Sequence, residues 1–296
     1  MNKDAIYVLV LAWNHKEDTR EVLYSVQASN YTNVRIAVIN NGSTDGTEEM
    51  LSTEFPTVEV IRSEKNLGVS GGYNLGINYA MNTGADYILI ANNDISVDPR
   101  MITNLYNGLI KISDAGIAMP KIFHYYGNRN RLWCTGAYWR KFPPTIKMRD
   151  YNKIDDANNN NIESIEFAPS CVLMLTSKLI NKIGMFDTNY FFYFDDWDYS
   201  KRARSERFKI IYVPTATMWH KISESTQKSD KPYKWWEEMG WSAARYYSKY
   251  HTNFQRFLFF SWFVIRESLK GKPAHGIAFI TGAKKYIQVK SNIKLA

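Results

Sequence analysis

The stretch AIYVLVLA at residues 5–12 decides the fold of this chain. It is apolar throughout and as long as a typical strand, which is the pattern of a strand buried on both faces of a sheet. Residues 17–29 follow with apolar side chains at helical spacing, and 34–39 is the next apolar run. The order strand, helix, strand predicts an α/β fold with a parallel, doubly wound sheet.

The same alternation continues along the chain. The further elements expected are strands at 58–61, 87–91, 172–175 and 209–213 and helices at 70–81 and 178–183. We expect another helix to begin at Asp98-Pro99, because Asp is a favoured N-cap residue and Pro is favoured at the first helical position. Ligands of such sheets bind at the carboxyl ends of the strands, so the polar residues there are the site candidates.

The regular alternation ends after Pro120. Residues 123–162 are rich in Tyr, Arg, Asn and Trp and include an Asn tract at 155–161, so they predict loops and a hairpin. From Tyr233 the chain looks helical, aromatic and basic. We expect one domain at 1–232, with halves at 1–120 and 121–232, and a helical extension at 233–296.

Charge is distributed unevenly along the 296 residues. The chain carries +8, yet residues 241–296 alone carry +9, with ten basic residues against Glu267, so residues 1–240 carry −1. Excess positive charge suits nucleic acid, anionic membranes or phosphorylated ligands. No recognition-helix or single-strand-binding signature is present, so we expect no nucleic-acid partner. Aromatic and basic residues together in the extension suit an anionic membrane surface, or packing of the aromatics on the rest of the chain.

Cysteines and apolar runs indicate the cellular location. Cys134 and Cys171 have no C-x-x-C spacing, which argues against a disulfide framework and a zinc site and fits a reducing cytosol. The N-terminal apolar run has the wrong length and flanks for a signal peptide, and the longest near-apolar run, 257–265, is about half of the ~20 residues that span a bilayer. We expect a cytoplasmic protein, with a peripheral position on the inner face of the cell membrane as a second expectation.

Polar and aromatic residues follow the first two strands. Leu11 and Trp13 end the first, where an indole can cover a nucleobase, although a core tryptophan is an equally weighted alternative. Asn40 begins the polar turn 40–46 after the second strand, and ordinary turn residues explain that turn as well. These positions are candidates for binding a nucleotide base.

Two later motifs offer phosphate and metal contacts. Asn66 to Asn74 contains Gly71 and leads into a helix, so its backbone can approach a ribose or diphosphate at the positive helix end. Asn92-Asn93-Asp94 ends the fourth strand, where a carboxylate can hold a divalent cation against phosphate oxygens. Helix entry and a polar turn are the alternatives for the two motifs.

The segment FFYFDDWDY at 191–199 is harder to explain as ordinary structure. Its three carboxylates, among them Asp195 and Asp196, lie among large aromatic residues and would be desolvated and mutually repelled. Such costs usually mark a functional site. His220 follows 24 residues after Asp196 and is either a structural histidine or, with Asp94, a metal ligand.

These motifs, in this order from Ala5 to Thr226, resemble the family 2 glycosyltransferases with the GT-A fold, and especially their bacterial rhamnosyltransferase-like branch. The resemblance includes the N-G-S-T-D-G turn, N-L-G-x-x-G-G and G-x-F-D at 184–187. It implies a Rossmann-like, mostly parallel sheet flanked by helices, with the nucleotide bound by residues 1–120 and the acceptor by 121–232. The implied activity is an inverting, metal-dependent hexosyltransferase of cell-surface polysaccharide synthesis.

The resemblance also implies partners and residue roles. The donor would be a nucleoside-diphosphate sugar, dTDP-rhamnose ahead of a UDP-hexose, and the acceptor a hydroxyl of a glycan or polyprenyl-linked saccharide. Mg²⁺ or Mn²⁺ would be ligated by Asp94 and His220, Asp196 would be the catalytic base and Asp195 would orient it or the acceptor. The residues implied in donor binding are Leu11, Trp13, Asn40, Asn66, Gly71, Asn92 and Asn93.

Two positions depart from the family pattern. Asn40 and Asn92 stand where the family usually or often has Asp, which weakens the assignment of the base and of the metal site. A nucleotidyltransferase and a catalytically inactive sugar-nucleotide or glycan-binding module are therefore the alternative functions.

Overall fold

The structure, a computed structural model, describes residues 4–156, 161–221 and 233–295. Most of the Asn tract and the end of the resemblance, 222–226, lie outside the described residues. The strands, in chain order, are β1 (Ile6–Ala12), β2 (Val34–Asn41), β3 (Glu59–Ser63), β4 (Tyr87–Asn92), β5 (Ile95–Val97), β6 (Ala115–His124), β7 (Leu132–Cys134), β8 (Ala137–Arg140), β9 (Thr145–Met148), β10 (Glu163–Ile165), β11 (Val172–Thr176) and β12 (Lys209–His220). The helices are α1 (Lys16–Gln27), α2 (Thr47–Glu54), α3 (Gly68–Asn82), α4 (Met101–Lys111), α5 (Ser177–Ile183), α6 (Asp195–Ser205), α8 (Tyr233–Tyr250), α9 (Asn253–Leu269) and α10 (Pro273–Leu295).

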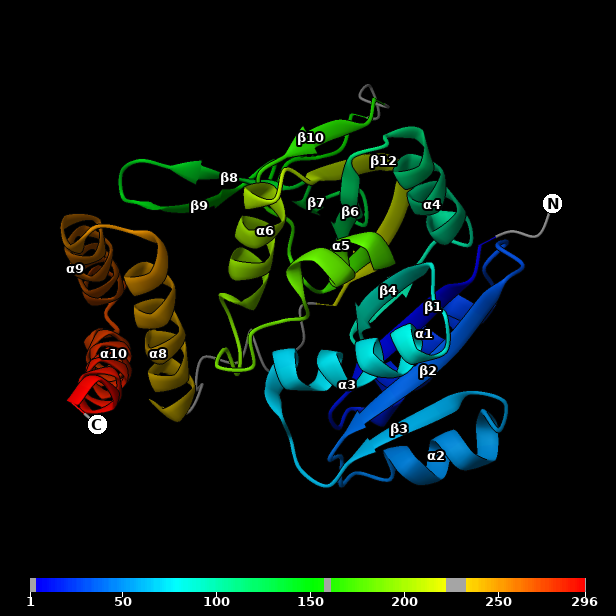
Figure 1. The fold of residues 1–296 in the computed structure, drawn as a ribbon, viewed down its shortest axis with the longest axis horizontal. Helices are drawn as coiled ribbons and strands as arrows, with labels where there is room; N and C mark the ends of the chain where they lie inside the picture. The colour runs from blue at the N-terminus through cyan, green and yellow to red at the C-terminus, as the bar shows by residue number, and fades with distance from the viewer. Residues whose placement is uncertain (1–3, 157–160, 222–232, 296) are drawn as a thin grey trace.

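One twisted sheet runs through the molecule (Figure 1). Its order is β10-β12-β6-β11-β4-β1-β2-β3, with β5 paired to β12 and β7 to β6. Along this path β3, β2, β1, β4, β6 and β12 run in one direction, and only β11 and β10 run the other way. The sheet is therefore mostly parallel, as the sequence predicts, with an antiparallel strand inserted between β4 and β6.

The first strand lies at the centre of the core. All seven of its residues are buried, and β1 pairs in parallel with β2 on one side and β4 on the other. Helix α3 approaches the sheet closely at Gly76, where a Cβ would lie 2.8 Å from a methyl carbon of Ile39. A larger residue at Gly76 would separate this helix from the sheet, so a small one is required there.

Several expected boundaries differ from the structure, among them the following three. Asp98 and Pro99 do not begin α4, because the Asp98 carboxylate and carbonyl accept hydrogen bonds from the backbone of Arg100 and Met101 and close a turn before the helix. The third strand covers 59–63 instead of 58–61. The last expected strand, 209–213, continues to His220, because a register shift against β6 after Val213 accommodates the proline at 214, which has no N–H to donate.

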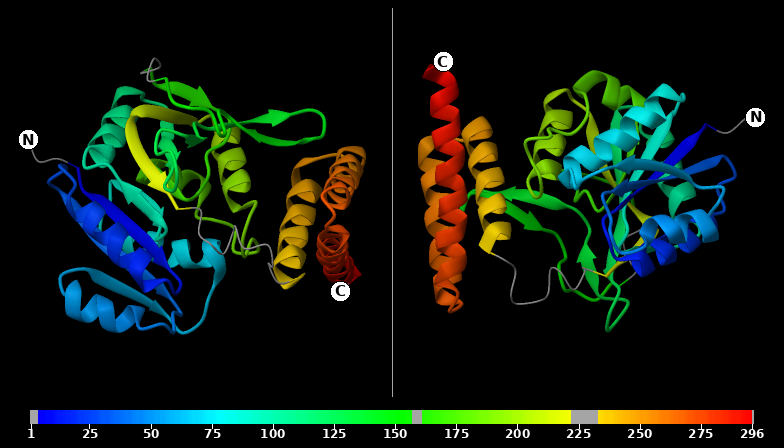
Figure 2. Two further views of the ribbon diagram at one scale, coloured as in Figure 1. Left: turned by 180° about the vertical axis from the view of Figure 1, so that it is seen from behind. Right: turned by 90° about the horizontal axis from the view of Figure 1, so that it is seen from below.

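The C-terminal helices stand beside α6 and the β8–β9 hairpin at one end of the molecule (Figures 1 and 2). Helices α8 and α10 touch at Gly240 and Gly282, where an added Cβ would fall within 2 Å of a carbonyl oxygen of the opposite helix. Aromatic side chains of α8, α9 and α10 form one buried cluster with Tyr190 and Phe194. No described helix is long and apolar enough to cross a bilayer. The buried aromatic residues of this extension therefore pack mostly against one another and, at one side, against Tyr190 and Phe194.

Candidate active site

Three parallel strands bring polar residues to one edge of the sheet. Ala12 pairs with Asn40, and Leu11 pairs with Asn92, so the segments that follow β1, β2 and β4 begin side by side. The Leu11 side chain is buried, whereas Trp13 is 52% exposed. The core alternative for Trp13 is wrong, and its indole is available to a ligand at this edge.

Hydrogen bonds tie these turns together. Asn14 has φ +57°, its N–H donates to Ser43 Oγ at 2.9 Å, and its side-chain oxygen accepts from Thr44 N at 2.8 Å. The Asn93 amide donates to the Asn14 carbonyl at 3.0 Å. Asn93 therefore holds the first turn in position.

Several asparagines are engaged by the protein itself. Asn40 Nδ2 donates to Glu48 Oε2 at 2.7 Å, and Asn40 Oδ1 accepts from Ser43 N at 3.1 Å. Asn66 Oδ1 accepts from Gly68 N at 2.8 Å and from Asn41 Nδ2 at 3.1 Å. These bonds shape the loops at the sheet edge, and a direct contact of Asn40 or Asn66 with a donor stays a prediction.

Gly71 lies in the first turns of α3, where the helix comes closest to the preceding loop. A Cβ there would lie 2.8 Å from Cβ of Leu67. The first turns of a helix carry free N–H groups and partial positive charge, which favour a phosphate. A side chain at position 71 would therefore press on Leu67, so a small residue is required there.

Asp94 and His220 lie together, as the sequence predicts for a metal pair. The residue after Asp94, Ile95, pairs with His220 in the sheet, and His220 Nε2 lies 3.2 Å from Asp94 Oδ1. Both side chains are buried, and within the described part of the chain neither imidazole nitrogen makes a hydrogen bond of normal geometry. Trp133 packs against the imidazole with ring centres 4.8 Å apart.

This donor set fits a divalent cation that the protein shares with a ligand. One carboxylate and one imidazole are common ligands of transition-metal ions. Across residues 4–156, 161–221 and 233–295 no group of three His, Cys, Asp or Glu side chains could hold a metal. Within those ranges the pair has no third side-chain ligand of these types.

The acidic segment begins helix α6. Tyr193 and Phe194 have φ of +60° and +65°, and this left-handed turn leads directly into Asp195. Asp195 is 4% exposed and accepts from Ser170 Oγ at 2.9 Å, whereas Asp196 is partly exposed. Burial raises the pKa of Asp195 to about 6, and burial together with the neighbouring Asp195 charge raises the pKa of Asp196 well above its ordinary value. Asp196 is therefore a stronger proton acceptor than an ordinary aspartate.

Asp198 has a different environment from the two carboxyls before it. It is buried, and it bonds Arg202 Nε and Lys249 Nζ at 2.7 Å each and the Tyr250 hydroxyl at 2.8 Å. Lys249 and Tyr250 belong to α8. Among the ion pairs of the described residues none involves Asp195 or Asp196, which lie beside Ser170, whereas Asp198 is anchored by cations of α6 and α8.

The glycine-rich loop touches the acidic segment. Val69 N donates to the Phe191 carbonyl oxygen at 2.8 Å. Gly68 has φ +74°, and there is no space for a Cβ at this position, because it would lie 2.3 Å from the same carbonyl oxygen. The Tyr73 hydroxyl donates to Asn92 Oδ1 at 2.7 Å and lies 3.3 Å from the carbonyl of Ser170. Tyr73 therefore connects the end of β4 to the residue that holds Asp195.

Sequence reasoning missed the role of Tyr73 and the α8 residues Lys249 and Tyr250 that bind Asp198. Tyr73 lies within the 66–74 motif, which does not indicate its contacts, and the two α8 residues act across about fifty positions of sequence. The G-x-F-D motif offered the only indirect signal, since its Asp187 forms an ion pair with Arg245 of α8 at 2.6 Å.

Comparisons with known proteins bear on the whole arrangement. The family model described as glycosyl transferase family 2 matches residues 7–173. The chain is 23% identical over 244 residues, 75% of this chain and 78% of the other, to N-acetylglucosaminyl-diphospho-decaprenol L-rhamnosyltransferase of Mycobacterium tuberculosis.

Two solved structures have a similar fold. GalNAc-T7 with UDP, GalNAc and Mn²⁺ gives a TM-score of 0.63 at 12% identity, with 91% of this chain and 59% of that chain covered. The mannosyltransferase PcManGT of Pyrobaculum calidifontis with GDP-Man and Mn²⁺ gives a TM-score of 0.55 at 12% identity, with 100% of this chain and 81% of that chain covered. The expected α/β GT-A architecture, with a mostly parallel sheet between helices, is confirmed.

Proposed function

Because this chain belongs to glycosyl transferase family 2, we propose that it transfers a sugar from a nucleoside diphosphate to an acceptor hydroxyl with inversion at the anomeric carbon. One observation carries this proposal. A carboxyl couple with raised pKa, the buried Asp195 and the partly exposed Asp196, is joined through Tyr73 and Ser170 to the strand end that leads to Asp94. A proton acceptor and a place for a diphosphate are thus connected, as glycosyl transfer requires.

Asp196 acts as the general base. The acceptor oxygen forms a bond to the anomeric carbon while the bond from that carbon to the diphosphate oxygen breaks, and the hydroxyl proton passes to the Asp196 carboxylate. The leaving diphosphate takes the electron pair, and a single displacement inverts the configuration. A positioned base of this kind contributes ~10²–10⁴ in rate. Asp195, which accepts a hydrogen bond from Ser170, orients Asp196 or the acceptor, and its charge keeps the proton affinity of Asp196 high.

Donor binding is assigned to the edge formed by β1, β2 and β4. Trp13 stacks on the base with Leu11 below it, Asn40 contacts the base edge, and Asn66, Gly71 and the Asn92-Asn93 pair adjoin ribose and phosphates. The exposed indole of Trp13 supports this assignment. Residues 1–120 would thus bind the nucleotide and 121–232 the acceptor.

Asp94 and His220 would hold Mg²⁺ or Mn²⁺. A bound ion neutralises the negative charge that develops on the diphosphate. The close approach of the two side chains and the unsatisfied imidazole support this role. Asn92 Oδ1 accepts a hydrogen bond from Tyr73, so we assign no metal contact to Asn92.

The donor we favour is dTDP-rhamnose, with a UDP-hexose second, and the acceptor a lipid-linked saccharide of bacterial surface polysaccharide synthesis. The relative from M. tuberculosis is named as an L-rhamnosyltransferase acting on a diphospho-decaprenol saccharide. The branch resemblance of the motifs supports the same choice.

Transfer by Asp196→Asn tests the function. The variant is assayed with Mn²⁺, labelled dTDP-rhamnose or UDP-sugars and a prenyl-diphosphate-linked N-acetylglucosamine, and donor binding is measured by calorimetry. We expect transfer to fall by at least ~10² while donor affinity stays within a few-fold. Asp114→Asn is the matched control, because Asp114 pairs only with Lys209 at an exposed site among the ion pairs of the described residues.

The other outcomes are distinguishable. Near-wild-type turnover in Asp196→Asn would remove this residue from the role of base, and a product of retained configuration would overturn the single displacement. Pyrophosphate release from a sugar phosphate and a nucleoside triphosphate would identify a nucleotidyltransferase. Donor binding without hydrolysis or transfer would identify an inactive binding module.

We also propose that the protein associates peripherally with anionic membranes through α9. Phe254, Phe257, Ile265 and Leu269 recur on one side of this helix and are 58–84% exposed, opposite the face that packs in the aromatic cluster. The +9 charge of residues 241–296 favours an anionic surface.

Vesicle flotation tests the membrane proposal. The triple variant Phe254→Ser, Phe257→Ser and Leu269→Ser should float less with anionic vesicles than the unchanged chain, whereas Ile110→Ser, an exposed apolar residue of α4, should float equally. Equal flotation of the triple variant would overturn the idea. Point changes are preferred to truncation, because the inner face of these helices is part of a buried core.

A further inference from the structure

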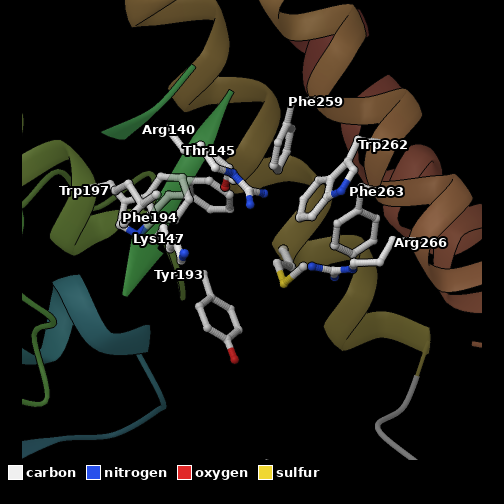
Figure 3. Close-up of a pocket in the computed structure, with 12 residues that line it drawn as sticks. Arg140, Thr145, Lys147, Tyr193, Phe194, Trp197, Phe259, Trp262, Phe263 and Arg266 are labelled. Atoms are coloured by element: carbon white, nitrogen blue, oxygen red, sulfur yellow. The ribbon is translucent and has the colours of Figure 1, made fainter. Parts of the chain in front are cut away.

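A cavity of about 300 Å³ lies between the β8–β9 hairpin, the turn before α6 and the helices α8 and α9 (Figure 3). Aromatic and basic side chains dominate its wall, and no Asp or Glu of the described residues lines it. The lining residues are Arg140, Thr145, Ile146, Lys147, Tyr193, Phe194, Trp197, Met239, Phe259, Trp262, Phe263 and Arg266.

Two of the three cations are uncompensated. Arg140 lies opposite Thr145 and Lys147 opposite Tyr138, so both basic side chains leave the same face of the hairpin. Among the described residues neither has a carboxylate within ion-pair distance, and Nε of Arg140 is buried without a hydrogen bond. Figure 3 shows the nitrogen atoms of Arg140 and Lys147 turned toward the space between the hairpin and α9.

The third cation belongs to the opposite wall. The Arg266 guanidinium pairs with Glu267 and lies 4.6 Å from the ring centres of Trp262 and Phe263. Because Glu267 also contacts Lys270, its charge is shared and Arg266 retains positive character toward the cavity. The cavity therefore collects positive charge from both sides.

The rest of the wall is apolar. Phe259, Trp262 and Phe263 of α9 face Phe194 and Trp197 of the acidic segment. An inorganic anion has no apolar group to contact these rings. A nucleoside needs hydrogen-bonding groups at the edges of its base, and this wall offers few of them. Cations beside a ring-lined space match an anion that carries an apolar chain.

The position of the cavity links it to the proposed base. Phe194 and Trp197 line it, and they immediately flank Asp195 and Asp196. A group that is anchored in the cavity would thus hold whatever it carries within reach of the carboxyl couple. The predicted donor contacts lie elsewhere, at the edge formed by β1, β2 and β4.

We propose that this cavity binds the diphosphate and the first isoprene units of a prenyl-diphosphate-linked acceptor. Arg140, Lys147 and Arg266 contact the diphosphate oxygens, and the rings of α9 contact the chain. The volume lies at the lower end of small-molecule sites, which fits a headgroup and the beginning of a chain. The acceptor role rests on the proposed function, whereas binding of the prenyl diphosphate does not.

Quenching of tryptophan fluorescence tests binding directly, because Trp197 and Trp262 line the cavity. The probe is farnesyl diphosphate, compared with farnesol, inorganic pyrophosphate and UDP. We expect farnesyl diphosphate to bind more tightly than farnesol or pyrophosphate. Arg140→Gln and Lys147→Gln should each weaken it by ~10-fold, the loss of one charge-assisted hydrogen bond, and the double variant more. Lys111→Gln, an exposed cation at the end of α4, should not change it.

The comparison ligands separate the sources of affinity. If pyrophosphate binds as tightly as farnesyl diphosphate, the cavity is a phosphate site that does not recognise the lipid. If farnesol binds as tightly, it is an apolar cavity in which the cations take no part. Either result overturns the proposal, and so does an unchanged affinity for farnesyl diphosphate in the double variant. If Arg140→Gln lowers the unfolding midpoint, Lys147→Gln alone decides, because Lys147 is exposed.

Failure of the proposed function is recognised separately. In the transfer assay the double variant should raise the KM for the lipid-linked acceptor and leave the affinity for UDP unchanged. Absence of transfer in the unchanged chain, together with tight farnesyl diphosphate binding that needs Arg140 and Lys147, would refute the function and leave the site. Transfer with an acceptor KM that does not respond to these changes would refute the site and leave the function.

Discussion

Asp195→Asn is expected to stabilise the ligand-free protein at neutral pH. Asp195 is buried, and burial raises its pKa from an ordinary value of 3.8 to about 6. A shift of about two units corresponds to about 3 kcal/mol of unfavourable free energy when the carboxyl is ionised. Asparagine has the same shape and can still accept the hydrogen bond from Ser170 Oγ, but it carries no charge.

The gain depends on pH in a defined direction. The pKa of Asp195 is higher in the folded than in the unfolded chain. The free-energy cost of ionising Asp195 in the folded chain is therefore absent below about pH 4, grows between pH 4 and pH 6, and is constant above that range. A gain of about 3 kcal/mol corresponds to a rise in the unfolding midpoint of roughly 6–12 °C for a chain of this size class.

Asp198→Asn is the matched contrast. The same chemical change, three residues along the same helix, leaves Arg202 and Lys249 facing a neutral group. Removing one partner of a buried ion pair typically destabilises a protein by about 3–5 kcal/mol. Neighbouring carboxyls should therefore respond with opposite signs.

Thermal unfolding in EDTA at pH 4, 5, 6 and 7.5 measures both effects. The reasoning fails if Asp195→Asn melts at or below the unchanged chain at pH 7.5, or if its gain is as large at pH 4. Stabilisation by Asp198→Asn would equally contradict the division of roles within the segment.

Four further predictions follow from the same geometry. As the pH is lowered, kcat should fall with an apparent pKa well above 4, because Asp196 must be deprotonated and its pKa is raised by burial and a neighbouring charge. A fall of kcat centred near pH 4 would contradict the role of Asp196 as the base. Trp13→Ala should raise the donor KM by about 5–100-fold, the size of one lost stacking contact, without changing the unfolding midpoint. His220→Ala should raise the Mn²⁺ concentration for half-maximal activity at least ~10-fold, and an unchanged metal titration would remove it as a ligand. Gly68→Ala should cost more unfolding free energy than Gly84→Ala, because both have positive φ but only Gly68 has a carbonyl oxygen 2.3 Å from an added Cβ.

The predictable part of the fold is the part that local pattern determines. The run at 5–12 is apolar because β1 is covered on both faces, so its place at the sheet centre follows from composition alone. The insertion of β11 against the direction of β4 depends on pairing between residues about eighty positions apart, and no local signal encodes it. The extension of β12 past a proline likewise depends on a register shift against β6.

The candidate site divides in the same way. The position of Trp13 and of the Asn92 to Asp94 turn at one sheet edge was predictable, because parallel strands end there and polar residues after apolar runs are visible in the sequence. The exposure of the Trp13 side chain was not predictable. The separate role of Asp198 was not predictable, since it is determined by Lys249 and Tyr250, about fifty residues further along. Spacing alone places three carboxylates together and cannot tell which of them a cation neutralises.

The C-terminal helices consequently belong to the structure of the acidic segment. Helix α6 is held on one side by Ser170, which bonds Asp195, and on the other by α8, whose Lys249 bonds Asp198. Part of the +9 charge is therefore used in ion pairs inside the molecule, and only the remaining cations are available to an anionic surface. A chain that ended before Tyr233 would remove Lys249 and Tyr250 from Asp198 and would remove the rings that cover Phe194. Its loss of transfer would therefore say nothing about membranes. Only changes on the outer face of α9 separate the two roles, because they leave both anchors of α6 in place.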